Sequence, residues 1–131
     1  MDVKLFYKSY PVKMSLGAMK QFNSDTGLDM WCTLLKFREC FLLTDGEPTI
    51  TRLSRLNSIV DFHTGAKLLH SLIKAEDKSI PLNEIEDGMF RSGWLPKEDD
   101  QAQPWPLLVV KLANDIDADF EQSTLKKKAG T

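Results

Sequence analysis

The 131-residue sequence has few of the residues that common covalent, metal and membrane sites require. Its two cysteines cannot make a disulfide framework, which favours a reducing compartment. No stretch approaches the roughly 18 apolar residues that a membrane-spanning helix needs. The first residues do not show a charged segment followed by an apolar one, so we expect no signal peptide. These absences predict a cytoplasmic protein without a membrane anchor.

An excess of basic residues is also missing. Lysine and arginine number 17 against 19 aspartates and glutamates, giving a formal net charge of −2. A general nucleic-acid binder usually carries a basic excess, so we expect no nucleic-acid partner. Hydrophobic residues at 42% suffice for a packed core. With no internal repeat, we predict one domain over residues 1–124 and a flexible basic tail over 125–131.

The first fourteen residues have a strand-like pattern. Val3, Leu5 and Tyr7 alternate with lysine and phenylalanine, which indicates a strand. Residues 9–11 contain Ser, Tyr and Pro and are expected to turn the chain, with 12–14 as the returning strand. We therefore predict an N-terminal hairpin over 1–14 that packs on the helices, because an isolated hairpin is marginally stable.

The remainder has helical spacing. Ser15 and Asp29 are expected N-caps and Gly27 an expected C-cap. The widest apolar face lies on the helix that follows Asp29, which predicts that this helix is central and most buried. Gly65 is expected to mark a kink or a break in the next helical stretch, with Thr64 available as an N-cap. The fold predicted is mainly α, a compact bundle of about five to six helices with the hairpin in front.

Spacing argues against a metal or nucleophilic site. His63 and His70 are about 10 Å apart along a helix, and Cys32 and Cys40 about 12 Å apart. We expect the cysteines to be buried thiols and the histidines to lie on the surface or at an interface. The acidic residues near 84–87 and 98–100 resemble solvated surface, and no glycine-rich phosphate loop is present. The sequence predicts no enzyme, no metal and no cofactor.

Surface for protein contact is the remaining candidate feature. Trp94 and Trp105 flank a polar stretch, 97–103, that is expected to be a mobile loop. Tryptophan is enriched in binding hot spots, although packing in the core is the competing interpretation for both. Trp31 is expected in the core. The candidate partner or self-association surface comprises Tyr7, Tyr10, Trp94, Leu95, Trp105 and Leu107.

Three segments resemble a known family. They are 16–22 (LGAMKQF), 26–28 (TGL) and 80–90 (IPLNEIEDGMF), and they follow a short opening hairpin. Together they resemble the tail assembly chaperones of lambda-like long-tailed phages, over nearly the whole chain. The resemblance implies a non-enzymatic protein of the host bacterial cytoplasm. It would bind and solubilise the tape measure protein, promote assembly of the tail tube and be absent from the virion.

The resemblance also implies partners and a second gene product. Such chaperones form homo-oligomers, act with a frameshifted longer form of themselves and come into contact with the tail tube protein. Consecutive lysine codons are A-rich, so Lys126, Lys127 and Lys128 are the candidate frameshift region. This chain would then be the short form.

Two other functions stay open. One is a small cytoplasmic adaptor or inhibitor that uses the same surfaces on a different protein target. The other is an enzyme with a site assembled from dispersed residues, which would need a deep pocket with convergent polar groups. A chaperone would instead present shallow apolar grooves and an oligomeric contact.

Overall fold

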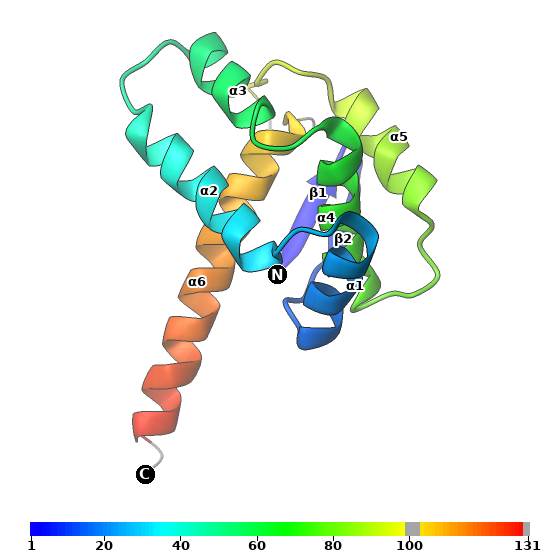
Figure 1. Ribbon diagram of the computed structural model, residues 1–131, viewed down its shortest axis with the longest axis vertical. Coiled ribbons are helices and arrows are strands. Elements are labelled where there is room, and N and C mark those ends of the chain that lie inside the picture. Colours follow the sequence, from blue (N-terminus) through cyan, green and yellow to red (C-terminus); the bar gives the residue numbers. More distant parts are fainter. Residues whose placement is uncertain (99–102, 130–131) are drawn as a thin grey trace.

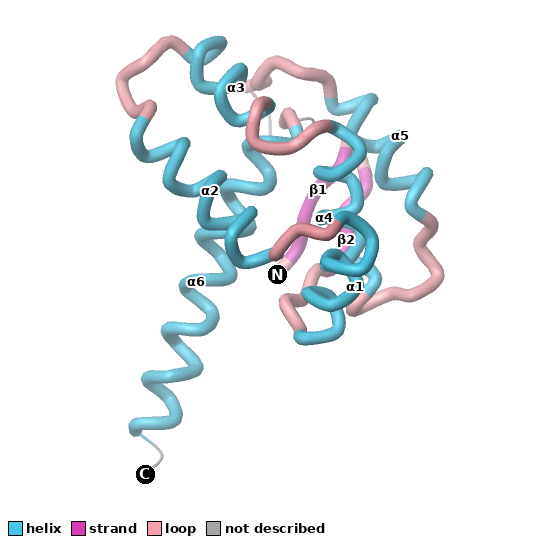
Figure 2. Tube along the Cα trace, viewed as in Figure 1, coloured by secondary structure: helices cyan, strands magenta, loops and turns pink. Residues whose placement is uncertain are grey.

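The computed structural model describes the backbone of residues 1–98 and 103–129, and the side chains of these residues up to Gln122. The predicted mainly helical fold with an N-terminal hairpin is confirmed: the described residues form two antiparallel strands and six helices (Figures 1 and 2). In chain order the elements are β1 Asp2–Leu5, β2 Lys8–Pro11, α1 Leu16–Thr26, α2 Met30–Leu43, α3 Thr49–Asn57, α4 Phe62–Lys74, α5 Leu82–Ser92 and α6 Trp105–Ala129. Most of the stretch expected to be a mobile loop, 99–102, lies outside the described residues.

Local sequence signals set the ends of the first two helices as predicted. The Ser15 hydroxyl accepts a hydrogen bond from the backbone N–H of Ala18 at 3.0 Å. Asp29 does the same for Cys32 at 2.8 Å. Gly27 ends α1 with φ 75°, a left-handed conformation that glycine adopts without steric cost.

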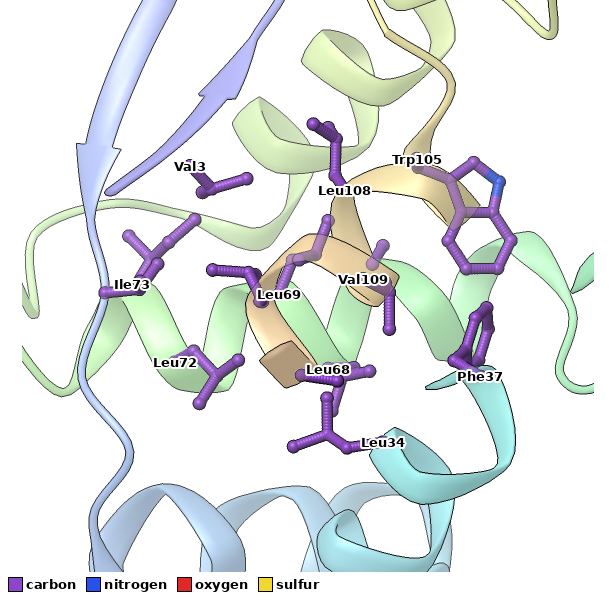
Figure 3. Close-up of a cluster of buried hydrophobic side chains, with 14 of the residues drawn as sticks. Val3, Leu34, Phe37, Leu68, Leu69, Leu72, Ile73, Trp105, Leu108 and Val109 are labelled. Atoms are coloured by element: carbon purple, nitrogen blue, oxygen red, sulfur yellow. The ribbon is translucent and has the colours of Figure 1, made fainter. Parts of the chain in front are cut away.

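The central helix is α4, and the prediction that α2 is central is wrong. In Figure 3, the α4 side chains Leu68, Leu69 and Leu72 lie between α6 and the neighbouring helices. These leucines are fully buried, whereas α2 buries mainly one stripe and exposes the other. A wide apolar face shows that a helix can be covered on several sides, but the number of packed neighbours decides how much is covered. The buried residues of α4 are Gly65, Ala66, Leu68, Leu69, Ser71, Leu72 and Ile73.

Gly65 lies within α4 and does not break it, contrary to expectation. The N-cap is Asp61, whose carboxylate accepts from the backbone N–H of Thr64 at 2.7 Å. The helix therefore begins before Thr64. Glycine is needed at position 65 because the Trp105 ring lies against the helix backbone there.

The hairpin exists, but its turn lies earlier than predicted. Leu5 pairs with Lys8, so Phe6 and Tyr7 make the turn, and the expected turn residues 9–11 belong to β2. The buried residues explain this register, because both strands turn one face to the core. After β2, the backbone N–H of Lys13 donates to the carbonyl of Leu72 at 3.0 Å and fixes the hairpin to α4.

Helix α6 has two unlike halves. Its first half is buried, and Ile116 is the last buried residue among its described side chains. Residues 117–122 are all exposed, and Figure 1 shows this end of α6 projecting away from the other helices. The backbone is helical to Ala129, so residues 125–129 continue the helix where the sequence predicted a tail. None of the helices within the described residues combines the length and the apolar content that crossing a lipid bilayer requires.

Candidate interaction surfaces

Three of the six predicted surface residues are exposed. Tyr7 lies in the hairpin turn, while Trp94 and Leu95 follow the C-terminal end of α5. The Trp94 side chain is 72% exposed, a large fraction for an indole. A large apolar ring in water contributes nothing to folding, so these three residues remain candidates for contact with a partner.

The other predicted surface residues are covered, which corrects the prediction for two of them. Tyr10 and Trp105 are buried, and Leu107 is half-buried. Trp105 packs against Gly65 and against the ring of Phe37, with 5.8 Å between ring centroids. For Trp105 the core interpretation is therefore the right one, and neither Tyr10 nor Trp105 offers its ring to a partner.

The hairpin turn and the C-terminal end of α5 carry four exposed apolar side chains, which we call the aromatic end: Tyr7, Phe90, Trp94 and Leu95. The two segments are joined because the backbone N–H of Phe6 donates to the hydroxyl of Ser92 at 2.8 Å. Phe90, which the sequence analysis did not select, is 78% exposed two residues before Ser92. Helical spacing gave no signal for it, because Phe90 lies off the buried face that Ile85 and Met89 share.

The hairpin turn is held in an unusual conformation. Phe6 has φ 58°, the only positive φ at a non-glycine residue in the described chain. A phenylalanine in this region is strained, so surrounding contacts must hold it. The Ser92 hydroxyl accepts from its N–H, and the Arg91 guanidinium lies 6.0 Å from its ring centroid. Tyr7, next in the turn, is exposed, and its ring centroid lies 4.1 Å from that of Phe6.

A polar cluster fixes the hairpin to the side of α5. The Tyr10 hydroxyl donates to the Glu84 carboxylate at 2.7 Å, and the Lys8 ammonium donates to the same oxygen at 3.1 Å. Burial, together with the hydrogen bond to the Glu84 carboxylate, raises the pKa of Tyr10. The hydrogen bonds from Tyr10 and Lys8 lower the pKa of Glu84. The cluster attaches the hairpin to α5 in a pH-dependent way, and its side chains line an open hollow of about 350 Å³ between the two.

Helix α2 carries a second exposed surface, which we call the α2 row: Leu35, Leu42 and Leu43. These residues are separated by seven and eight positions, so they lie on one side of the helix. Leu43 is 76% exposed, and the other two are more than half exposed. From the width of its apolar face, this helix was expected to be the most buried one, with these leucines covered. That expectation is wrong, because no element among the described residues covers this side of α2 and its leucines are exposed.

Contacts to α6 flank the α2 row. The half-buried Trp31 ring lies 5.4 Å from the ring of Phe120, rather than in the core as expected. Two helical turns further along α2, the Arg38 guanidinium donates to the Asp117 carboxylate at 3.0 Å. These contacts hold the start of the projecting half of α6 against α2.

On its other flank, the α2 row borders a hollow of about 460 Å³ between α2 and α3. Leu43 and Ile59 supply its apolar lining, and Lys36, Glu39 and Arg55 its charged rim. Arg52 of α3 links the two helices by donating a hydrogen bond to the carbonyl of Phe41 in α2 at 2.7 Å. The hollow is shallow and continuous with the row, as expected for a groove that accepts side chains of another protein.

The two cysteines lie on α2 and the two histidines on α4. Within the described residues, no three His, Cys, Asp or Glu side chains lie together as possible metal ligands. His63 is exposed beside Glu86, with 2.9 Å between Nδ1 and the carboxylate, and His70 lies 2.7 Å from the carbonyl of Ile80. Cys32 is exposed and Cys40 half-buried, which corrects the prediction of two buried thiols. The reason is that both lie outside the buried stripe of α2.

Comparisons with known proteins add no relative. No protein-family model matches the chain, and neither a curated protein nor a solved structure matches it significantly.

Proposed function

We propose that this protein is a phage tail assembly chaperone of the lambda-like type, acting in the host bacterial cytoplasm without enzymatic activity. It binds the tape measure protein, keeps it soluble and promotes assembly of the tail tube around it. It then leaves before the virion is complete. The observation that carries this proposal is the α2 row, an uncovered apolar side of a helix in a small domain.

The geometry of the α2 row suits a long helical client. Leu35 and Leu42 lie seven residues apart, about 10 Å along the helix axis, so they match apolar residues two turns apart on a client helix. The charged rim of the neighbouring hollow restricts the contact to a narrow apolar seam. A contact of this size is weak, so many copies along one client would supply the affinity through avidity. Weak individual contacts also allow tail tube protein to displace each copy.

Co-expression with a tape measure fragment tests the proposal. The chaperone should keep the fragment soluble and co-purify with it in several copies. The double variant Leu42→Gln/Leu43→Gln should lose both effects. Leu16→Gln/Leu28→Gln, which changes two exposed leucines, one at the start of α1 and one just after its end, is the matched control and should retain them. An unaltered chain that neither binds nor solubilises the fragment would contradict the proposal.

A second candidate function rests on the aromatic end. Exposed aromatic side chains such as Trp94, Phe90 and Tyr7 are typical of a hot spot for one folded target, as in an adaptor or inhibitor. That function predicts a one-to-one complex that Trp94→Ala abolishes and Leu42→Gln/Leu43→Gln leaves intact. The chaperone predicts the opposite pattern, so the two variants separate the functions.

The proposed family membership extends to the gene. The longer form would arise by frameshifting near the codons for Lys126, Lys127 and Lys128, and it would tether the tape measure protein while the short form covers it. The nucleotide sequence tests this directly. A slippery heptamer followed by an open alternative frame is expected, and the lack of either would refute the frameshift.

A further inference from the structure

We infer that the exposed side of α2 pairs antiparallel with the same side of α2 in a second copy of this chain. The pairing brings two self-complementary features together, a pair of opposite charges and the leucines of the α2 row. It does not depend on the tape measure protein. Its consequence rests on the proposed function: the second copy covers the α2 row until a client helix takes its place.

The exposed side of α2 is continuous along the helix. Its residues recur at spacings of three and four positions, so they share one side of the helix, opposite the buried stripe that contains Leu34 and Phe37. Figure 1 shows α2 at an edge of the molecule. Residues at these spacings form the seam along which two helices pair. The exposed residues are Cys32, Leu35, Lys36, Glu39, Leu42 and Leu43.

Two opposite charges lie at the middle of this side. Lys36 and Glu39 are exposed, and within the part of the chain that the structure describes neither of them forms an ion pair. Reversing the helix about the point between residues 37 and 38 places Lys36 level with Glu39 of the other copy. A two-fold axis repeats every contact, so this pair forms twice. Parallel pairing would place like charges side by side, which costs free energy, so the charges favour the antiparallel arrangement.

The same register aligns the apolar residues. Leu35 of one copy then lies about 3 Å along the helix axis from Leu42 of the other, close enough for the two side chains to interdigitate. Leu43 comes level with Cys32 of the other copy, because these two positions are equally far from the centre. One register therefore pairs the charges and covers the leucines, which identifies the occupant as a second copy.

The size of the contact makes the pairing reversible. Helix α2 has 14 residues, so one pair of these helices buries little surface, and we expect an interface below the roughly 1,200 Å² of a standard complex. Leu35 and Leu42 cannot contact a second copy and a client helix at once. The tape measure protein should therefore dissociate the dimer by mass action. Until then, the second copy shields the exposed leucines from non-specific association.

Sedimentation and light scattering of the chain alone, at protein concentrations up to the millimolar range, test the inference. At about 0.1 M salt the screening length is about 10 Å, so exposed charges still interact. The parent should form a dimer that weakens as salt is raised. Lys36→Glu and, separately, Glu39→Lys should each weaken the dimer by about tenfold or more, because each places like charges side by side. The exchange variant Lys36→Glu/Glu39→Lys has opposite charges again and should dimerise as the parent does.

Mixing the two single variants is the decisive comparison. One exposed side then carries two acids and the other carries two bases, so the mixture should form a heterodimer although neither variant pairs with itself. Lys20→Glu and Asp2→Lys change the net charge equally at exposed sites outside α2, and both should dimerise as the parent does. Circular dichroism should show that all variants remain folded. A parent that stays monomeric, or an exchange variant no stronger than the single variants, would overturn the inference.

A disulfide tests the register. Leu43→Cys places a thiol level with the native Cys32 of the other copy, so the oxidant diamide should link positions 32 and 43 between chains. Within one chain these positions are about 16 Å apart along the axis, which is too far for a disulfide. Leu16→Cys, at an exposed site of α1, is the control and should not link to Cys32. Mass spectrometry of the linked peptides identifies the register, and links from 43 to 43 would show parallel pairing and refute the antiparallel one.

Failure here is separable from failure of the proposed function. A chain that dimerises in this way but ignores the tape measure fragment supports the pairing and refutes the chaperone. A strict monomer that solubilises the fragment does the reverse. Where both activities are present, adding the fragment should dissociate the dimer. A dimer that binds the fragment and stays intact would show that the client does not replace the second copy on α2.

Discussion

The indole of Trp105 lies against the backbone of Gly65, so closely that a β-carbon at position 65 would be 2.5 Å from Cζ3 of the ring. The contact joins the first turn of α6 to the central helix α4. It explains two features at once: a glycine inside a buried helix, and a tryptophan that the sequence could equally well have placed on the surface.

Gly65→Ala should therefore destabilise the protein by about 1–3 kcal/mol, as overpacking of a core does. The Trp105 ring is rigid and buried, so it cannot move away cheaply. Gly17→Ala is the matched control, since its nearest atom would be Ser15 Oγ at 3.8 Å. In a helix this change should stabilise by about 0.5–1 kcal/mol. Urea denaturation measures both, and equal stabilities for the two variants would contradict the packing argument.

Ser92→Ala should destabilise the protein by about 1–3 kcal/mol, because it leaves the backbone N–H of Phe6 without an acceptor. The strained φ of Phe6 would lose its main support, so exchange of the Phe6 amide proton should also become faster. Ser24→Ala, at an exposed position of α1, should be neutral or slightly stabilising. Thermal denaturation compares the two serines, and unchanged amide exchange in Ser92→Ala would show that the turn does not depend on this bond.

Acid should weaken the attachment of the hairpin to α5. Hydrogen bonds lower the pKa of Glu84 in the folded state below its ordinary 4.5, so its stabilising contribution is complete above that pH. The contribution is lost as pH falls below 4.5 through the folded-state pKa, because the protonated carboxyl no longer accepts both bonds as a charged group. Glu84→Gln should flatten this part of the stability profile. The remaining loss of stability in acid should come from Asp61 and Asp77, because hydrogen bonds lower the pKa of these carboxyls as well.

The same cluster predicts a loss at alkaline pH. The pKa of Tyr10 is raised above 10.0, mainly by burial, so the folded state holds a proton that the unfolded state releases. Stability should be complete below pH 10 and decline above it, and Tyr10→Phe should reduce that decline. Chemical denaturation across both pH ranges measures the two effects. A Tyr10→Phe profile identical in shape to the parent would show that the hydroxyl has no such role.

The sequence predicts local features of this fold better than it predicts burial. Ser15, Gly27 and Asp29 act within a few residues of themselves, so their roles as caps follow from residue type alone. Whether α2 or α4 is central depends on which helices pack around each one, and both have wide apolar faces. Gly65 shows the same limit, because only the distant Trp105 explains it.

The exposed residues of the candidate binding surfaces could be predicted only in part, because exposure also depends on packing between distant elements. Trp94 stands beside a glycine and a proline at the end of a helix, which indicates a position outside the core. Leu35 and Leu42 give no such sign, because an apolar stripe on a helix has the same pattern whether a neighbour covers it or not. The helical period reveals a second apolar face, but only the packing shows that α2 leaves it open.

The α2 row should therefore tolerate changes that the buried stripe of the same helix does not. Leu42→Gln/Leu43→Gln removes two exposed apolar side chains, so the free energy of unfolding should stay within about 0.5 kcal/mol per site of the parent. Leu34 lies on the buried stripe of the same helix. Leu34→Ala should lower the free energy of unfolding by about 2–5 kcal/mol because it leaves a cavity beside α4 and α6. Equilibrium denaturation distinguishes the two sites. If the glutamine variant were as unstable as Leu34→Ala, the row would be part of the core, and its loss of tape measure binding could not be assigned to the surface.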